Sequence, residues 1–143
     1  DRSRGLGKMS MTDEYVQEYL RRPLVAVIST VDASNNPRSA PIWFHWENGA
    51  AYMFTGRTTL KWRNIQRNPE VALCITDTSR QIKSLTVLGQ ADVEVDNSSA
   101  QELHRRLSIL YLGPDEGGDW ADSMEDEEMA IIRIMPSKFL WTG

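Results

Sequence analysis

The residues best suited to chemistry lie together in one segment between Phe54 and Pro69. An apolar run ends at Gly56, and Thr58 or Thr59 then caps a short helix that stops before Pro69. The start of a helix has unpaired N–H groups and a partial positive charge, both of which attract anions. The segment therefore predicts an anion site where a strand ends and a helix begins.

Four polar side chains lie within one turn of this helix start: Thr55, Arg57, Thr59 and Lys61. Hydroxyl, guanidinium and ammonium groups are ordinary phosphate ligands, and Lys61 is the best candidate for a direct one. The segment matches no named phosphate-binding loop. A capped helix with a solvated basic face is therefore the alternative interpretation.

Composition narrows the class of protein. The chain has 143 residues, of which 41% are hydrophobic and 25% charged, as is typical of one globular domain. No apolar run approaches the ~20 residues of a membrane-spanning helix, so no membrane association is expected. The net charge of −4 argues against nucleic-acid binding. The single cysteine, Cys74, cannot form an internal disulfide, which favours a cytoplasmic location, and its apolar strand predicts a core thiol.

Few other groups suggest catalysis by side chains. Neither His45 nor His104 has a second histidine or a cysteine at metal-ligand spacing, so no metal is predicted. His104 is expected on a helix surface, whereas His45 follows a strand and is a candidate for a substrate pocket. No Ser-His-Asp set or carboxylate pair is recognisable, so no catalytic residue is assigned.

Apolar runs separated by short turns predict a mainly β, antiparallel domain. Residues 1–10 are expected to form a flexible leader and residues 11–143 a single domain. Closure into a barrel would remove the edges of so apolar a sheet. We expect six or seven strands and three peripheral helices, the strands at 24–31, 38–46, 50–55, 71–76, 82–95, 129–135 and 138–142, and the helices at 12–22, 58–68 and 98–112.

Some strand residues predict local detail. Pro41 lacks an N–H group and favours an edge strand or a bulge. Gly89 interrupts a long strand and predicts a bulge or a close approach of two backbones. Asn36 is expected in the left-handed conformation within a turn, and the turn at 47–49 is expected to close a hairpin. Pro136 is expected to end a strand.

The helical regions carry signals of their own. Thr12 is expected to cap the first helix, and Ser98 with Gln101 forms a capping-box pattern for the third. The acidic segment 113–128, with Trp120 as its one large apolar side chain, is expected to be a mobile loop.

Several short sequence strings follow one another along the chain: 29–32, 37–44, 52–56, Lys61-x-x-Asn64-Ile65, Asn68-Pro69-x-Val71-Ala72, Val87-Leu88-Gly89-x-Ala91 and Ile134-x-Pro136. Together they resemble the pyridoxamine 5′-phosphate oxidase-like family of FMN-binding split β-barrels. The resemblance extends from about Leu20 to Thr142.

This resemblance implies a homodimer with a flavin, FMN, at each of two sites between the subunits. It also implies an oxidoreductase that transfers a hydride to or from a small organic substrate. The flavin would lie along Ser39, Ala40, Pro41, Ile42 and Trp43, beside Phe54, with its phosphate at Thr55, Arg57, Thr59 and Lys61. Ser84 falls where the family often has a polar contact to the ring. Because the ring itself carries the hydride, a catalytic side chain is not required.

The chain departs from true pyridoxamine oxidases, which have basic residues in place of Ser39 and Phe44 and a basic pair in place of Leu60-Lys61. They also end in an arginine–histidine motif that is absent from residues 138–143. A substrate other than pyridoxamine phosphate is therefore expected.

Two alternatives to an FMN enzyme stay open. The Pro-x-Trp element at Pro41 and the Lys-x-x-Asn helix also resemble a branch of the superfamily that uses a 5-deazaflavin coenzyme. Arg63 and Arg67 would then hold its longer anionic tail, or they face water. A non-catalytic flavin-binding protein is the other alternative.

Overall fold

The computed structural model describes residues 7–9, 14–77 and 83–142. Thr12 and most of the expected leader lie outside these residues. The described chain forms β1 (Gly7–Met9), α1 (Glu14–Leu20), β2 (Ala26–Val31), β3 (Pro37–Ile42), β4 (His45–Glu47), β5 (Ala50–Gly56), α2 (Leu60–Arg67), β6 (Glu70–Asp77), β7 (Lys83–Glu94), α3 (Asn97–Leu112), α4 (Pro114–Ser123) and β8 (Met129–Thr142). Among the helices described, none is long and apolar enough to cross a membrane.

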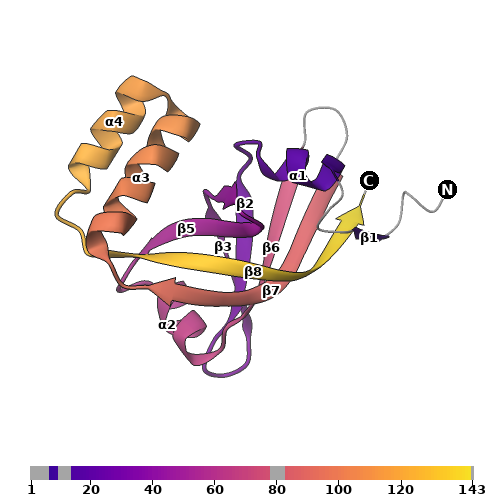
Figure 1. Ribbon diagram of the computed structural model, residues 1–143. Helices are drawn as coiled ribbons and strands as arrows, with labels where there is room; N and C mark the ends of the chain where they lie inside the picture. Colours follow the sequence, from indigo (N-terminus) through magenta and orange to yellow (C-terminus); the bar gives the residue numbers. More distant parts are fainter. Residues whose placement is uncertain (1–6, 10–13, 78–82, 143) are drawn as a thin grey trace.

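The eight described strands form one antiparallel sheet, and seven of them follow the order β3-β2-β6-β7-β8-β5-β4 (Figure 1). β3 and β4 are the two ends of this order, yet only Trp43 and Phe44 separate them in the chain. The sheet must therefore curl until its ends approach each other at these residues. The expected antiparallel split barrel is confirmed.

β1 pairs with the end of β8, Gly7 lying opposite Trp141. Three residues of the expected flexible leader therefore pair through their backbone with the sheet, because this end of β8 has a free edge.

The core fills the barrel from alternate residues of its strands. The most deeply buried of these side chains have at most 1% of their surface exposed: Ile28, Met53, Leu73, Ile75, Leu85, Val87, Ile132 and Ile134. Cys74 lies between two of them on β6 and so points to the outer face, where it is partly exposed. The prediction of a core thiol is wrong, because an apolar strand alone does not show which face a residue occupies.

Several turn and edge signals are confirmed. Asn48 and Gly49 have φ of 52° and 76° and turn the β4–β5 hairpin. Pro41 lies on β3, an edge strand of the sheet. Gly89 lies at the register shift between β7 and β8, where an added Cβ would be 2.3 Å from the Met135 carbonyl oxygen.

Two strand predictions need correction. β8 continues through Pro136, because Leu88 pairs with Lys138 while Gly89 pairs with Pro136, so Ser137 is the extra residue of a bulge. The left-handed residue of the β2–β3 turn is Asn35, with φ 63°, and not Asn36.

The structure also changes the description of the helices. The capping residue of α3 is Asp96, whose carboxylate accepts from the N–H groups of Ser98 and Ser99. Ser98 is therefore inside the helix, and Gln101 is free for another role.

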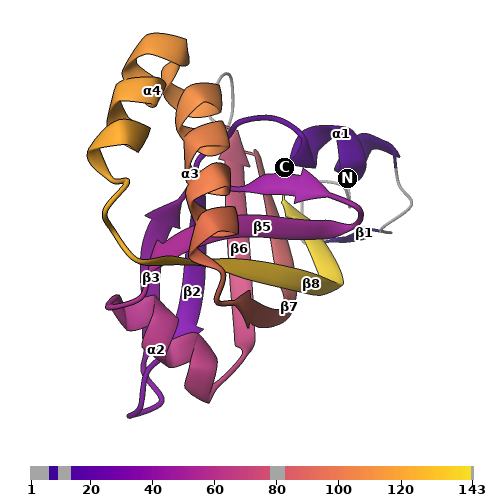
Figure 2. The ribbon, with the colours of Figure 1, turned by 60° about the vertical axis from the view of Figure 1, so that its left-hand side comes forward.

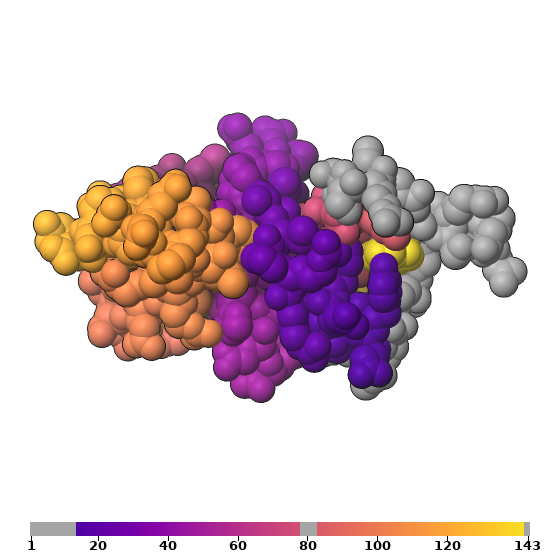
Figure 3. Space-filling model, turned by 90° about the horizontal axis from the view of Figure 1, so that it is seen from above, coloured from indigo at the N-terminus to yellow at the C-terminus, as the bar shows by residue number. Residues whose placement is uncertain are grey.

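The acidic segment expected to be a mobile loop contains a fourth helix, α4. Pro114 occupies its first turn with Asp115 and Glu116, an arrangement that favours a helix start. α4 packs along α3, and the pair projects from one end of the barrel (Figure 3). The packing is close, because a Cβ added to Gly117 would be 2.3 Å from the Ser108 carbonyl oxygen.

Candidate functional site

A cleft of about 490 Å³ opens at the split of the barrel. It lies where the ends of β3 and β5 meet the start of α2, elements that stand close together in Figure 2. Its lining residues are Val25, Pro41, Ile42, Trp43, Phe54, Thr55, Gly56, Thr59, Lys61, Met124, Glu127 and Met129. The two stretches predicted to hold the ring and the phosphate therefore share one cavity.

A second, smaller cavity of about 220 Å³ continues from the first. Both are lined by Thr59 and Lys61, and the smaller one extends along β3 past Ser39 and Ala40 to Arg38. Lys61 therefore stands between a largely apolar cleft and a narrower groove.

Thr55 and Thr59 form the corner between β5 and α2. Their hydroxyl oxygens are 2.8 Å apart, and Thr59 caps α2 by accepting from the N–H of Trp62. This confirms Thr59 as one of the two expected caps. The N–H groups of Leu60 and Lys61 have no hydrogen-bond acceptor among the described residues. They leave the start of α2 with two free donors.

Lys61 is half-buried, and its ammonium group has neither an ion pair nor a hydrogen bond in the described part of the chain. Burial lowers the pKa of Lys61 below its ordinary value. A partly desolvated cation without a counter-ion gains from a bound anion more than a solvated one does.

Hydrogen bonds from two side chains of α2, one of them buried, fix the helix against the barrel. The side-chain amide of Asn64, 1% exposed, donates to the Thr30 hydroxyl at 3.1 Å. Arg67 donates to the Val31 carbonyl at 2.8 Å and to the Asn64 side chain at 3.0 Å. Arg67 therefore supports the helix rather than the cleft, while Arg63 donates to the Thr58 carbonyl.

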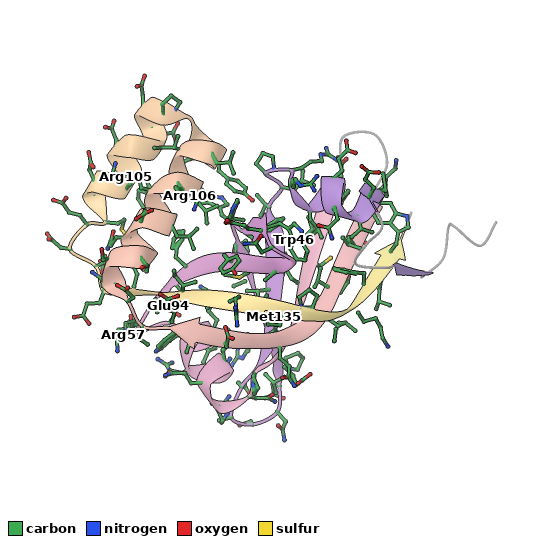
Figure 4. The ribbon with its side chains drawn as sticks, in the orientation of Figure 1. Trp46, Arg57, Glu94, Arg105, Arg106 and Met135 are labelled. Atoms are coloured by element: carbon green, nitrogen blue, oxygen red, sulfur yellow. The ribbon has the colours of Figure 1, made fainter. Side chains whose placement is uncertain are left out.

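Two predicted residues do not line either cavity. The Arg57 guanidinium is 3.8 Å from the Glu128 carboxylate, at the barrel edge below the α3–α4 pair (Figure 4). Ser84 lies on β7, and two strands, β2 and β6, separate it from β3. Within one chain, neither residue meets the others at the cleft.

Trp43 owes its position to a residue that the sequence did not single out. Its ring stacks on Tyr111 of α3, with centroids 5.1 Å apart and planes 14° from parallel. The Tyr111 hydroxyl donates to the Leu24 carbonyl at 2.8 Å, and burial raises the pKa of this phenol. Tyr111 thus connects α3 to the wall of the cleft.

One wall of the cleft was also missed by sequence reasoning. Met124 and Glu127 belong to the connection between α4 and β8, and Met129 is the first residue of β8. The Gln101 side chain holds this connection by donating to the carbonyls of Met124, at 3.0 Å, and Glu127, at 2.7 Å. No local sequence signal relates these residues to the cleft, because the α3–α4 pair brings them there from far along the chain.

His104 does not lie where it was expected, whereas the substrate-pocket role of His45 stays a prediction. His45 lines a separate cavity beside α3, not this cleft. His104 is completely buried rather than on a surface, because α4 covers its face of α3, and both of its ring nitrogens lack a hydrogen-bond partner in the described part of the chain. Its ring packs edge-on against Phe54, with centroids 4.4 Å apart. Among the described residues, no group of three or more His, Cys, Asp or Glu side chains is placed to hold a metal.

Comparison with solved structures places this geometry among known folds. An F420 reductase is 26% identical with a TM-score of 0.69, covering 86% of this chain and 94% of the other. A conserved hypothetical protein from Mycobacterium tuberculosis is 18% identical with a TM-score of 0.76, covering 94% and 86% of the two chains. A heme storage protein from Vibrio cholerae, 18% identical with a TM-score of 0.69 over 94% and 95%, shares the fold.

Comparison with protein families gives a more specific result than these structural likenesses. No curated protein sequence matches the chain. The family model for pyridoxamine 5′-phosphate oxidase matches residues 11–141. This match includes both cavities, the helix that carries Lys61 and the last strand of the barrel. The chain therefore belongs to the pyridoxamine 5′-phosphate oxidase family.

Proposed function

We propose that this protein is a hydride-transferring oxidoreductase that binds FMN in the cleft at the split of its barrel. Its substrate is a small organic molecule other than pyridoxamine phosphate. The observation that carries the proposal is Lys61, a half-buried cation without a counter-ion at the junction of an apolar cleft and the start of α2. A molecule with a flat apolar ring and an anionic phosphate complements this arrangement.

The residues present suit the flavin in charge and in shape. The free N–H groups of Leu60 and Lys61 and the Lys61 ammonium would hold the phosphate. Ile42, Trp43 and Phe54 offer apolar walls to the ring. When bound, the flavin supplies the hydride chemistry, and the chain's residues bind it, orient it and exclude water.

A homodimer with the flavin between subunits is part of the proposal. Beside the cleft, Val25 and Val27 are 53% and 39% exposed, an apolar surface suited to burial against a second copy. Ser84 is too far across the sheet from β3 to serve its own cleft, so we assign it to the flavin held by the other subunit. Sedimentation should give twice the 16.3 kDa mass of the chain.

A 5-deazaflavin coenzyme is the second candidate, favoured by two observations. A structure 26% identical to this chain is described as an F420 reductase. The groove past Lys61 toward Ser39 and Arg38 offers room for an anionic tail longer than a single phosphate. Arg67 does not serve this tail, because it is held by Val31 and Asn64.

The first experiment is an absorbance spectrum of the purified protein, followed by mass analysis of what denaturation releases. Released FMN supports the first candidate and a released deazaflavin the second. If neither is present, both are added back, and a protein that binds neither contradicts the proposal. A protein that binds flavin but is not reoxidised by any substrate faster than by air is a non-catalytic flavin-binding protein.

Lys61→Ala should weaken FMN binding at least about tenfold, because a hydrogen bond to a charged group contributes roughly 1.5–3 kcal/mol. Riboflavin, which has no phosphate, should lose little affinity, and fluorescence titration measures both ligands. Arg63→Gln is the control, since Arg63 is an exposed cation on the same helix and lines neither cavity. Equal losses for FMN and riboflavin would move the phosphate away from Lys61.

A further inference from the structure

A third cavity, of about 420 Å³, lies between α3 and β4. It is lined by His45, Leu103, Arg106, Leu107, Ile109 and Leu110. None of these residues lines the cleft at the split of the barrel, which we call the coenzyme cleft. We call it the α3 cavity. Nothing proposed above for the flavin uses it.

The α3 cavity has a buried apolar floor and an exposed apolar rim. Leu103, Leu107 and Leu110 follow each other at the spacing of one helical face. Leu103 and Leu107 are 6% and 2% exposed, whereas Leu110 and Ile109 at the rim are 51% and 37% exposed. Leu110 therefore continues the buried face of α3 into solvent. The cavity therefore presents apolar surface to water, which an apolar ligand would bury favourably.

At the polar end of the cavity, an arginine and a carboxylate compete for one histidine nitrogen. Arg106 Nη2 is 3.2 Å from His45 Nε2, and the Glu47 carboxylate is 3.0 Å from the same nitrogen. If Nε2 carries a proton it donates to Glu47, and the Arg106 N–H faces another donor. If Nε2 carries no proton it accepts from Arg106, and Glu47 faces a lone pair. One of the two contacts is unfavourable in either state.

Apart from His45, Arg106 is the ionisable side chain that lines the α3 cavity. It has no ion pair in the described part of the chain, in contrast to its neighbour Arg105, which pairs with Asp122 of α4. Figure 4 shows the two arginines on different sides of α3, Arg105 toward α4 and Arg106 toward the barrel. Arg106 thus brings a positive charge that has no ion pair among the described residues to a cavity lined mainly by leucine and isoleucine.

We propose that the α3 cavity binds a small amphipathic carboxylate, with its apolar body against Leu103, Leu107 and Leu110 and its carboxylate on Arg106. A planar carboxylate accepts two parallel hydrogen bonds from a guanidinium. With this acceptor in place, Arg106 no longer needs His45 Nε2 as its acceptor, and the Nε2 N–H can donate to Glu47. A cationic ligand is excluded, because Glu47 does not line the cavity and Arg106 does.

Binding of octanoate tests the proposal, with 1-octanol and octylamine as uncharged and cationic comparators of the same length. Isothermal titration of the whole protein should show saturable octanoate binding at least about tenfold tighter than that of either comparator. Arg106→Gln should remove this preference for octanoate while leaving the weak binding of 1-octanol unchanged. Arg105→Gln, one residue away on the other side of α3, should keep the preference.

Other outcomes would overturn the proposal. They are an absence of saturable octanoate binding, equal affinities for octanoate and 1-octanol, or unchanged octanoate affinity in Arg106→Gln. Lys61→Ala should leave octanoate binding intact, so that failure at the coenzyme cleft and failure at the α3 cavity are distinguished. Octanoate binding that is lost in Lys61→Ala and kept in Arg106→Gln would assign the ligand to the coenzyme cleft.

Discussion

Replacing Gly117 by alanine should lower the free energy of unfolding by about 3 kcal/mol, near the upper end of overpacking effects. The added methyl group would lie 2.3 Å from the Ser108 carbonyl oxygen and 2.6 Å from the Ile109 Cα, both backbone atoms of α3. Backbone in a helix does not turn aside as a flexible side chain does. α4 must therefore move away from α3.

Gly118 provides a matched control for this substitution. It is the next residue of the same helix, and an added Cβ would have no neighbour within 4 Å. Gly118→Ala should raise the free energy of unfolding by about 0.5–1 kcal/mol, because alanine loses less backbone entropy in a helix than glycine. Urea denaturation of both variants measures the contrast. Similar effects of the two substitutions would show that α4 does not pack closely on α3.

The shift of α4 away from α3 in Gly117→Ala should also change the shape of the cleft. α4 leads directly into Met124 and Glu127, which form one wall of the cleft. A shift of α4 should therefore weaken coenzyme binding in Gly117→Ala, even though Gly117 lines neither cavity there, and leave it unchanged in Gly118→Ala.

Replacing His104 by leucine should raise the free energy of unfolding by about 2 kcal/mol at pH 7, since an unsatisfied buried polar group costs roughly 1–3 kcal/mol. His104 of α3 is fully buried against Phe54 and α4, and among the described residues neither ring nitrogen has a hydrogen-bond partner. Leucine fills much of the same volume without a polar atom. Burial of the leucine side chain therefore stabilises the folded state, whereas burial of the unpaired imidazole destabilises it.

The benefit of this substitution should grow as the pH falls. Burial lowers the pKa of His104 below its ordinary value of 6.5, and the nearby Arg105 lowers it further. Below pH 6.5 the unfolded chain therefore binds a proton that the folded chain does not, and the folded state loses stability. The loss is at most about 1.4 kcal/mol for each pH unit, and above pH 6.5 it is absent.

Denaturation of the native protein and His104→Leu between pH 5 and 8 measures this difference. Ser108→Ala is the control, because the Ser108 hydroxyl is also buried without a partner but does not titrate in this range. It should raise stability by a similar amount at every pH. The contrary result is that the free energies of unfolding of the native protein and of His104→Leu differ by the same amount at every pH below 6.5. Such a result would show that His104 takes up its proton without opening the α3–α4 contact.

The sequence by itself determined the elements whose signals act within a few residues. A threonine cap and a following proline define α2, the Asn48-Gly49 pair defines a hairpin, and Pro41 identifies an edge strand. Short-range steric and hydrogen-bonding preferences produce these features in any surroundings. The order of the short strings along the chain was sufficient to suggest the family, and the cap placed Lys61 at the start of a helix.

Only the tertiary structure decided which of these residues meet. Lys61 and Arg67 are both basic residues of one predicted helix. In the structure Arg67 holds α2 against the barrel, whereas Lys61 faces the cleft and has no counter-ion among the described residues. The glycines of the acidic segment suggested a loop, but Gly117 is the residue that allows α4 to approach α3 closely. That approach buries His104 and brings Met124 and Glu127 to the cleft. Burial of this kind depends on chain segments far apart in sequence, so no local pattern encodes it.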